Sequence, residues 1–488
     1  MRSLWTDQAI ADAAAPSAPL PHYGQLIDGV MVEGERRMPV LSPADAQPFA
    51  TVPDASPEEL SRAISAAQHA FGRWSETDFA ARRQCLRRFA DAMRHNIDEI
   101  AEALTREQGK PLSRSRREIA NAAGAIESMI AIEVSPRLLR DDARERVELR
   151  YRPLGVAAGI TAWNVPIMLA AQKIAQALYT GNTMVLKPSP YAPVATLLLG
   201  RLSIGLLPPG VLNIISGGNA LGARLTSDPR ISKISFTGSG PTGEAVLKAA
   251  APHFARVTLE LGGNDAAIVL PDVDPDAVVP EIFAAAFNNA GQICMAIKRL
   301  YVHADIYDAM VDRLADLAES VRLGDGMDPE TDMGPVQNRA QFDKLLGLLA
   351  DIRATPGARI AAGGEVPDRA GYFIRPTIVA DVAEGTRIVD EEPFGPMLPV
   401  IRYDDVEDAI ARANATPFGL SGSVWTSDLD RGAKLAGRLE VGTAWVNRHG
   451  GGDGAIPFGG AKASGIGREH GRLGLASYME PQVLHVRK

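Results

Sequence analysis

The segment from Ala286 to Arg299, AFNNAGQICMAIKR, holds the side chain with the clearest reactive chemistry, the thiol of Cys294. A structural cysteine usually lies on an apolar face of a helix or strand, but Cys294 follows small and polar residues at 288–292. Gly291 interrupts the helical pattern there and permits close approach of another backbone segment. These features favour an accessible nucleophile, and the alternative is a packed cysteine near a helix end.

A carboxylate and an amide lie at the ends of two predicted strands. Glu260, in TLELGGN, is either a surface cap or a partly buried base with a raised pKa. Asn164, in TAWNVP, could donate its amide to an oxyanion, or it could be an ordinary turn residue. Beside a thiol, these groups suit addition to a carbonyl followed by hydrolysis of the covalent product.

A glycine-rich turn at 235–243, SFTGSGPTG, joins a predicted strand to a predicted helix. The unpaired N–H groups at the start of such a helix can bind a phosphate. The turn lacks the GxGxxG order, and no phosphate-binding lysine follows it as in a P-loop. Taken alone, it is therefore as compatible with an ordinary strand–helix turn as with a nucleotide site.

The elements that must position these residues change in character near Val147. Before it the pattern is mostly helical, with a capping signal at Ser56-Pro57-Glu58-Glu59 and further helices predicted over 80–96, 97–108 and 113–134. Arg137–Glu148 is highly charged and predicts either a solvated segment or an exposed ribbon.

After Val147, β-rich runs alternate with helical runs up to residue 261. This alternation predicts βαβ units and a parallel sheet, whose ligands bind beyond the carboxyl ends of the strands. The predicted strands are 156–161, 183–187, 211–215, 231–236 and 256–261, and the predicted helices are 167–179, 193–206, 220–227 and 240–250.

A second α/β block follows, and the tail at 478–486 alternates like a strand. In this block we predict strands over 266–270, 300–303, 373–379, 422–425 and 443–447, and helices over 275–290, 305–322, 341–352 and 406–413.

Length and composition limit the class of protein. A chain of 488 residues is expected to form two or three domains. A formal net charge of −8 disfavours nucleic acid and acidic membranes as partners, and two cysteines make no disulfide framework. Residues 1–20 lack a long apolar core and predict a flexible lead-in, and no apolar run reaches the ~20 residues of a membrane span. We expect a cytoplasmic protein.

Seven motifs occur together and in order: TAWNVP, LKPS, SFTGS, LELGGN, GQICMA, EEPFGP and PFGGAKASGIGRE. From about residue 25 to its end, the chain resembles the aldehyde dehydrogenase superfamily. The resemblance implies an α/β fold with a Rossmann-like cofactor-binding domain (21–130 and 150–260), an α/β catalytic domain (261–474) and a small β oligomerisation ribbon (131–149 and 475–488). It also implies a homodimer or homotetramer.

The resemblance implies a role for each matching residue. Cys294 is the nucleophile, Asn164 with the Cys294 N–H binds the oxyanion, Glu260 activates water, and Lys173 and Glu469 relay protons. No metal is implied. The implied cofactor-binding residues are Ile160, Thr161, Trp163, Lys187, Ser189, Gly217, Phe236, Gly238, Ser239, Thr242, Leu261, Glu392 and Phe394.

The sequence departs from the family pattern at the cofactor. Pro190 stands where a glutamate often binds the adenosine ribose hydroxyls, which leaves room for a 2′-phosphate beside Lys187 and Ser189. A carboxylate at that position would repel such a phosphate. We therefore expect NAD or NADP, without a choice between them.

The substrate tunnel also departs from the family, because polar or small residues replace aromatic ones. We expect a wider, more polar mouth, and hence a bulky or aromatic aldehyde as substrate. A semialdehyde whose carboxylate contacts Arg448 or Lys298 is an alternative, and His449 could also touch a polar substrate. Further alternatives are a catalytically silent binding relative and a CoA-acylating enzyme, which the presence of Glu260 disfavours. The pocket residues in question are Val165, Gln172, Asn288, Phe458 and, at a glycine-rich loop, Gly452.

Overall fold

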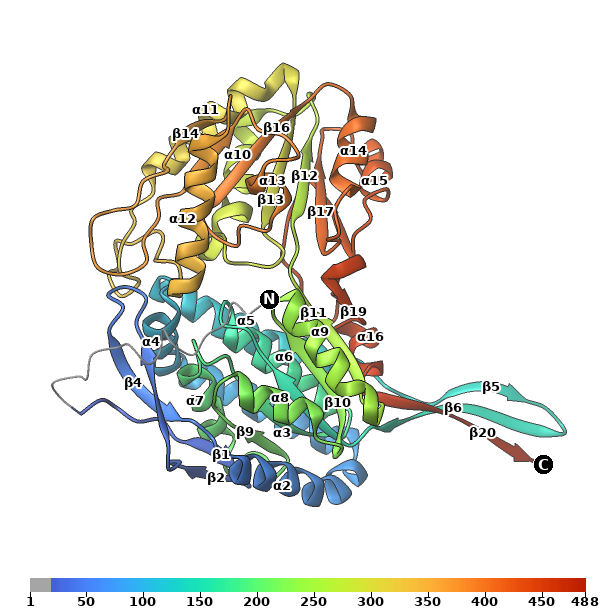
Figure 1. Cartoon of the computed structure of the whole chain (residues 1–488). Coiled ribbons are helices and arrows are strands. Elements are labelled where there is room, and N and C mark those ends of the chain that lie inside the picture. The colour runs from blue at the N-terminus through green and yellow to red at the C-terminus, as the bar shows by residue number, and fades with distance from the viewer. Residues whose placement is uncertain (1–18) are drawn as a thin grey trace.

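The computed structural model describes residues 19–488, so almost all of the lead-in predicted for 1–20 lies outside the described residues. Figure 1 shows two stacked α/β bodies and a long ribbon that leaves the lower one. Among the described residues, the lower body is built on an eight-stranded sheet, the upper body on a seven-stranded sheet, and the ribbon on three strands.

Four short strands occupy a region for which the sequence predicted mainly helices. β1 (Gln25–Ile27) and β2 (Val30–Val32) form a hairpin around Asp28 and Gly29, whose φ angles are 52° and 77°. Asp-Gly is typical of the tight turn that needs two positive φ angles. β3 (Arg37–Leu41) and β4 (Pro48–Pro53) form a separate antiparallel pair. The mainly helical expectation was wrong here because strands of three to six residues carry too little periodicity.

The helices that follow begin as predicted. In α2 (Pro57–Glu76), Ser56 Oγ accepts a hydrogen bond from the Glu59 N–H at 3.2 Å, and the Glu59 carboxylate accepts one from the Ser56 N–H at 2.8 Å. This is the predicted capping box. The next helices are α3 (Phe79–His95), α4 (Ile97–Gln108) and α5 (Leu112–Ile130).

The lower sheet has the predicted parallel arrangement. Five neighbouring strands, in the order β11-β10-β7-β8-β9, are parallel, so their carboxyl ends meet at one edge. Residues 261–264 join this edge directly to the first strand of the upper sheet. The strands are β7 (Val156–Ile160), β8 (Thr183–Lys187), β9 (Leu212–Ile214), β10 (Ile231–Thr237) and β11 (Arg256–Glu260), joined by α6 (Pro166–Tyr179), α7 (Val194–Ser203), α8 (Asn219–Ser227) and α9 (Gly240–Ala250).

The upper sheet has the order β14-β15-β16-β13-β12-β17-β18. Its interior strand β16 (Met397–Tyr403) was not predicted, because Pro399 within it argues against a central strand. β14 (Arg359–Ala362), α15 (Leu429–Ala436) and α16 (Gly471–Ala476) were also missed. The other elements are β12 (Asp265–Val269), α10 (Pro275–Phe287), β13 (Ile297–His303), α11 (Tyr307–Ser320), α12 (Arg339–Ala354), β15 (Thr377–Ala380), α13 (Arg387–Asp390), α14 (Val406–Asn414), β17 (Ser421–Trp425) and β18 (Thr443–Val446).

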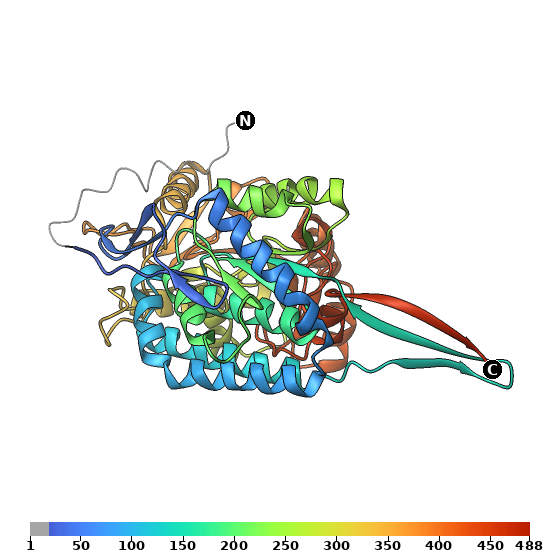
Figure 2. The same cartoon turned by 90° about the horizontal axis from the view of Figure 1, so that it is seen from below.

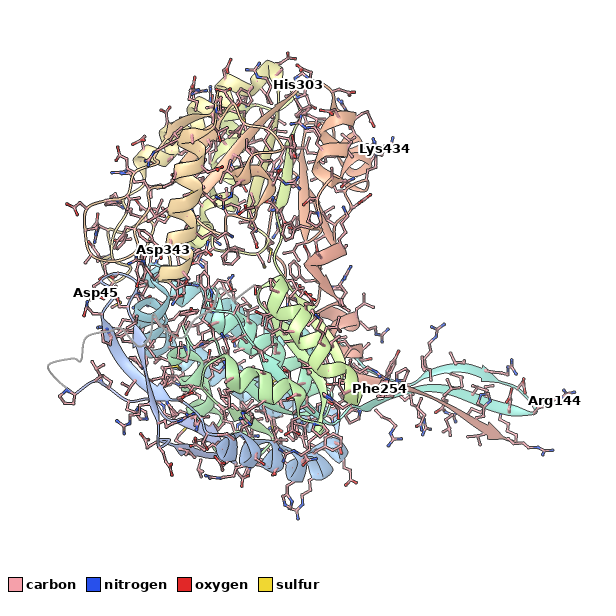
Figure 3. The ribbon with its side chains drawn as sticks, in the orientation of Figure 1. Asp45, Arg144, Phe254, His303, Asp343 and Lys434 are labelled. Atoms are coloured by element: carbon pink, nitrogen blue, oxygen red, sulfur yellow. The ribbon has the colours of Figure 1, made fainter. Side chains whose placement is uncertain are left out.

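The charged segment after α5 forms a ribbon. β5 (Arg137–Asp141), β6 (Glu145–Pro153) and β20 (Met479–Arg487) pair antiparallel in the order β20-β6-β5. Figure 2 shows the ribbon projecting from the body, and Figure 3 places Arg144 at its tip and Phe254 near its base. A short strand from late in the chain, β19 (Gly465–Ile466), pairs with β11 and so extends the lower sheet. No helix within residues 19–488 combines the length and the apolar character needed to cross a bilayer.

Candidate active site

Cys294 follows a tight turn in which Asn289, Ala290 and Gly291 have φ angles of 55°, 55° and 69°. These angles end α10 at Phe287, three residues before the predicted end at 290. A Cβ at position 291 would lie 2.2 Å from a carbonyl oxygen of the segment 393–396, so the turn requires glycine. The turn leaves Cys294 partly exposed.

The thiol of Cys294 is surrounded mostly by protein, and this desolvation raises its pKa to about 12. Lys298 opposes the rise, whereas the carboxylates of Glu260, Asp265 and Glu392 add to it. Because a thiolate is the reactive form, the nucleophile depends on a nearby cation or base at neutral pH.

The amide of Asn164 lies against the backbone that leads into the nucleophile. Its Nδ2 donates to the carbonyl oxygen of Gln292 at 3.0 Å. An amide nitrogen has two hydrogens, so one remains for another acceptor such as an oxyanion. The carbonyl oxygen of Asn164 accepts hydrogen bonds from Lys110 Nζ at 2.9 Å and from Asn289 Nδ2 at 3.0 Å. These contacts fix Asn164 beside the segment that carries Cys294.

Glu260 ends β11 with a buried carboxylate. It is 5% exposed, and within residues 19–488 neither of its carboxylate oxygens has a hydrogen-bond partner. Burial raises the pKa of Glu260 well above its ordinary value, and the negative charge of Glu469 raises it further, against Lys173 and Arg468. A carboxylate in this state can accept a proton near neutral pH, as a general base must.

Lys173 and Glu469 form a buried ion pair. Ser235 Oγ joins them: it accepts from Lys173 Nζ at 2.8 Å and donates to Glu469 Oε1 at 2.6 Å. Burial favours a raised pKa for Glu469, but Lys173 and the Ser235 hydrogen bond hold it below the ordinary value. The structure thus brings Glu260, Lys173 and Glu469 within electrostatic reach of one another, and it adds Ser235, which the sequence analysis did not single out.

Hydroxyl groups without partners gather where the parallel strands end. Thr161 Oγ1, after β7, and Thr237 Oγ1, at the end of β10, are buried and make no hydrogen bond within residues 19–488. Ser239 precedes α9, but its Oγ contacts Thr242 Oγ1 at 2.9 Å instead of capping the helix. The first N–H groups of α9 therefore have no side-chain cap and suit a phosphate. This donor set fits a dinucleotide cofactor.

Other predicted cofactor residues lie along the same edge. Ile160 in β7 is level with Lys187 in β8 and with Phe236 in β10. A Cβ on Gly238 would lie 2.5 Å from the tip of the Phe236 ring, so a side chain at this position would require the ring to shift. Leu261 follows β11 and contacts α9, while Ser189 and Gly217 lie in the loops after β8 and β9.

Trp163, Glu392 and Phe394 contact one another or the residues between Glu260 and Lys298. The rings of Trp163 and Phe394 meet edge to face, with centroids 5.4 Å apart. Glu392 Oε1 accepts from the Gly263 N–H at 3.1 Å and lies 3.3 Å from Lys298 Nζ. The structure therefore brings both predicted nicotinamide-side residues to the segment between Glu260 and Cys294.

The four predicted pocket residues lie on three elements. Val165 is the half-buried residue before α6, and Gln172, which is 8% exposed, lies within α6 beside Lys173. Asn288 is exposed at the turn before Cys294. Phe458 exchanges backbone hydrogen bonds of 2.8 Å with Glu469, which places it next to the ion pair of Lys173 and Glu469.

The three residues considered as substrate anchors already have partners within the protein. Lys298 is 2% exposed and donates to the carbonyl oxygen of Cys294. Both ring nitrogens of His449 are occupied, by Ser423 Oγ at 2.8 Å and by the Met295 carbonyl oxygen at 2.9 Å. Arg448 is exposed and donates to the carbonyl oxygen of Gly450.

A buried ion pair beneath Asn164 was missed by the sequence analysis. Lys110 Nζ lies 2.5 Å from Glu118 Oε2, and Glu118 Oε1 accepts from the N–H groups of Ile167 and Met168 at the start of α6. The pair therefore fixes the loop that carries Asn164. The sequence gives no sign of this pair, because most lysine and glutamate side chains are exposed to water and nothing marks these two as buried.

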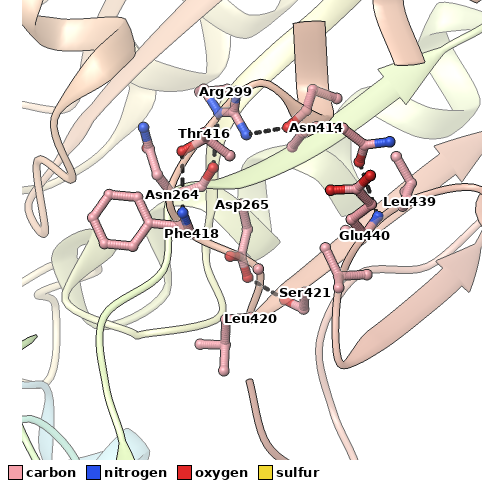
Figure 4. Close-up of a pocket in the computed structure, with 15 residues that line it drawn as sticks. Asn264, Asp265, Arg299, Asn414, Thr416, Phe418, Leu420, Ser421, Leu439 and Glu440 are labelled. Atoms are coloured by element: carbon pink, nitrogen blue, oxygen red, sulfur yellow. Dashed lines mark hydrogen bonds between the residues drawn. The ribbon is translucent and has the colours of Figure 1, made fainter. Parts of the chain in front are cut away.

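A small cavity lies beside the strands β12, β13 and β17, and Figure 4 shows the residues that line it. Asp265 accepts a hydrogen bond from Ser421, and Arg299 donates to the carbonyl oxygens of Asn264 at 2.8 Å and of Ala413 at 2.9 Å. These partners account for Asp265 and Arg299, while the buried Asn264 Oδ1 makes no hydrogen bond within residues 19–488. We assign the cavity to the framework that holds β12, β13 and β17 together.

Comparison with known proteins identifies the class. Residues 30–484 match the model of the aldehyde dehydrogenase family. Aldehyde dehydrogenase LUC3 of a Fusarium species is 39% identical over 90% of this chain and 93% of its own length. A betaine aldehyde dehydrogenase of Cereibacter sphaeroides is 37% identical over 96% of this chain and 97% of its own.

Among solved structures, the NAD+ complex of an aldehyde dehydrogenase from Bacillus cereus superposes with a TM-score of 0.93, at 33% identity over 96% of each chain. The chain belongs to the aldehyde dehydrogenase family. It is an aldehyde dehydrogenase that uses NAD or NADP as the electron acceptor, and the predicted fold class is confirmed.

Proposed function

We propose that this enzyme oxidises a bulky, branched or aromatic aldehyde to the carboxylic acid through covalent intermediates on Cys294. The sulfur adds to the aldehyde carbon, and the free Asn164 amide hydrogen and the Cys294 N–H stabilise the oxyanion, each by about 10²–10³ in rate. A nicotinamide cofactor, held by the residues at the carboxyl ends of the parallel strands, would accept the hydride that the thiohemiacetal loses in becoming a thioester. Glu260 then takes a proton from water, whose oxygen attacks the thioester and releases the acid.

The observation that carries this proposal is the carboxylate of Glu260. It is buried, has no hydrogen-bond partner within the described residues, and acts electrostatically on the Cys294 thiol. Burying a carboxylate without a hydrogen-bond partner costs folding free energy, which favours a functional role over a structural one for Glu260. The pair Lys173–Glu469, joined by Ser235, gives a route by which the proton from Glu260 can move on.

The environment of the three proposed anchors favours a bulky aldehyde over a semialdehyde. Lys298 and His449 already have partners, and Arg448 contacts the backbone of its own loop. Betaine aldehyde, the substrate in the names of several relatives, carries a quaternary ammonium group, and aromatic side chains bind such groups. Here Gln172, Asn288 and Gly452 stand where the family often has aromatic residues. The semialdehyde remains the alternative to test.

The remaining expectations are also proposals. Among residues 19–488, the two outer strands of the ribbon, β5 and β20, each have an unpaired edge that suits pairing with a second copy, so we propose a homodimer or homotetramer. We propose that residues 21–130 and 150–260 bind the cofactor and that 261–474 carry the catalytic functions. A cytoplasmic location is proposed from the two cysteines, both of which are free in the structure.

The test is reduced-cofactor formation against aromatic, branched, carboxylated and quaternary ammonium aldehydes, with NAD and with NADP. The Cys294→Ala variant is the control. Turnover that disappears in this variant and is highest with aromatic or branched aldehydes supports the proposal. Highest turnover with a carboxylated aldehyde would replace it with the semialdehyde alternative. Cofactor binding without turnover would favour a silent relative, or a CoA-dependent one if CoA restores activity.

A further inference from the structure

Lys298 places a buried positive charge directly behind the nucleophile. It lies four residues after Cys294 at the start of β13, and its Nζ donates to the Cys294 carbonyl oxygen at 2.5 Å. The same Nζ lies 3.3 Å from Glu392 Oε1 and 5.8 Å from the ring centre of Phe394. Burying an ammonium group is costly unless it is paired. Its partners here all lie at the site.

The next peptide is held in a similar way by His449. Its Nε2 lies 2.9 Å from the Met295 carbonyl oxygen, which can only accept, so Nε2 carries the hydrogen. Its Nδ1 then accepts from Ser423 Oγ at 2.8 Å. Burial lowers the pKa of His449 to about 3, so the ring is neutral. The carbonyl groups of Cys294 and Met295 are thus both fixed by buried donors.

We propose that Lys298 is a positioning residue for Cys294, which fixes the peptide of the nucleophile and favours the thiolate, with Glu392 as the opposing charge. The inference rests on the proposed function of Cys294 and deepens it. It replaces the expectation that Lys298 anchors the carboxylate of a substrate.

The charges around Cys294 make the effect testable by its sign. Lys298 favours the thiolate, whereas Glu260, Asp265 and Glu392 disfavour it, and His449 is neutral. Removing the charge of Lys298 therefore lowers thiol reactivity, and removing the charge of Glu392 raises it. If Lys298 and Glu392 merely supported the fold, their substitution would not change thiol reactivity in opposite directions.

The experiment is the pH dependence of alkylation by iodoacetamide, a neutral reagent, in the cofactor-free protein. Cys85→Ser provides the background, so that Cys294 is the single thiol. At pH 8 we expect Lys298→Met to react about tenfold more slowly, because one pKa unit changes the thiolate fraction tenfold below the pKa. Glu392→Gln keeps an acceptor for the Gly263 N–H and is expected to react about threefold faster. Lys298→Arg, which keeps the charge, is expected to remain within about threefold of the parent.

Lys344→Met is the matched control. Lys344 Nζ donates to the backbone carbonyl oxygen of Glu392 at 2.6 Å, so it touches the same residue, whereas the charges that act on the thiol are those of Lys298, Glu260, Asp265 and Glu392. Its alkylation rate is expected to stay within about twofold of the parent, and thermal melting checks that each variant is folded.

Equal rates in Lys298→Met and the parent, or a change of the same sign in Lys298→Met and Glu392→Gln, would overturn the inference. If Lys298→Met does not fold, the rates of Lys298→Arg and Glu392→Gln decide: the inference fails if the Glu392 variant is not faster. Alkylation needs no aldehyde. The expected pattern without turnover on any aldehyde would therefore reject the proposed function and leave the role of Lys298 intact.

Discussion

The chemistry at the scale of single residues depends on desolvation. The thiol of Cys294 and the carboxylate of Glu260 both have raised pKa values, because burial penalises their charged forms. For a general base near neutral pH this is useful, since the ordinary pKa of a glutamate is too low. For the thiol it is a cost, which the charge of Lys298 reduces.

Replacing Glu260 by Gln is expected to separate the two halves of the reaction. The amide cannot accept a proton, so thioester hydrolysis should slow by about 10²–10⁴, while hydride transfer continues. Stopped-flow absorbance should then show a burst of reduced cofactor, about one per active site, followed by a slow steady rate. A steady rate close to that of the parent would contradict the role of Glu260 as base.

The raised pKa of Glu260 also predicts a pH-dependent difference in stability. The folded state holds this proton to a higher pH than the unfolded state, where the pKa is about 4.3. The contribution of protonated Glu260 to the free energy of unfolding is therefore complete below pH ~4.3, and it is lost as the pH rises through the pKa of Glu260 in the folded state. Relative to Glu260→Gln, the parent should lose free energy of unfolding between pH 5 and pH 8, measured by denaturant titration. A difference that stays constant or shrinks would count against a raised pKa.

At the scale of elements, the cofactor edge depends on how closely α9 packs on β11. A Cβ on Gly243 would lie 2.6 Å from the side chain of Leu261, so a side chain at this position would require Leu261 or the helix to shift. The N-terminus of α9 is the place where we propose that the pyrophosphate binds. The position of this N-terminus therefore depends on Gly243, which need not touch the cofactor.

Gly243→Val is expected to displace α9 and to weaken binding of reduced cofactor by about tenfold or more, measured by fluorescence titration. Gly72→Ala in α2 is the control, because nothing lies within 4 Å of the added carbon. That substitution should leave binding unchanged and stabilise the helix by about 1 kcal/mol. Unchanged cofactor affinity in Gly243→Val would show that the helix start does not bind the phosphates.

At the scale of the whole molecule, the ribbon is a part of the described chain that exposes apolar side chains and unpaired strand edges to solvent. It projects from the body in Figures 1 and 2, and Leu138, Leu139, Val483 and Val486 on it are exposed. Exposed apolar side chains on strands with unpaired edges favour association with another chain. This is the physical basis of the proposed homo-oligomer.

Removing residues 479–488 takes away β20 and leaves one edge of β6 unpaired. We expect the truncated chain to have the mass of a monomer, or of a smaller oligomer than the parent, by light scattering after size-exclusion chromatography. A truncation of Lys488 alone removes no ribbon strand and is the control. An unchanged mass after the longer truncation would place the oligomer contact elsewhere.

Much of the fold follows from local signals. The capping box at Ser56 and the alternation of strand and helix between Val156 and Glu260 are each produced by residues close together in sequence, and the structure confirms both. The interior strand β16 was missed, because its proline argues against a central strand. Its place in the sheet depends on pairing with β13 and β15, which are distant in sequence. The hairpin at Asp28-Gly29 was missed although its turn signal is local.

By itself, the sequence determined the class of chemistry, because seven motifs occur in order, among them those that hold Cys294, Glu260 and Asn164. The tertiary structure decided the state of those groups. On sequence grounds Lys298 could be a substrate anchor. The structure places its Nζ beside Glu392, far along the chain, and against the Cys294 carbonyl oxygen, and these contacts are the basis of the role that we propose for it. The reason is physical: a residue type fixes which charges are possible, whereas burial and distant partners fix which of them act on a given atom.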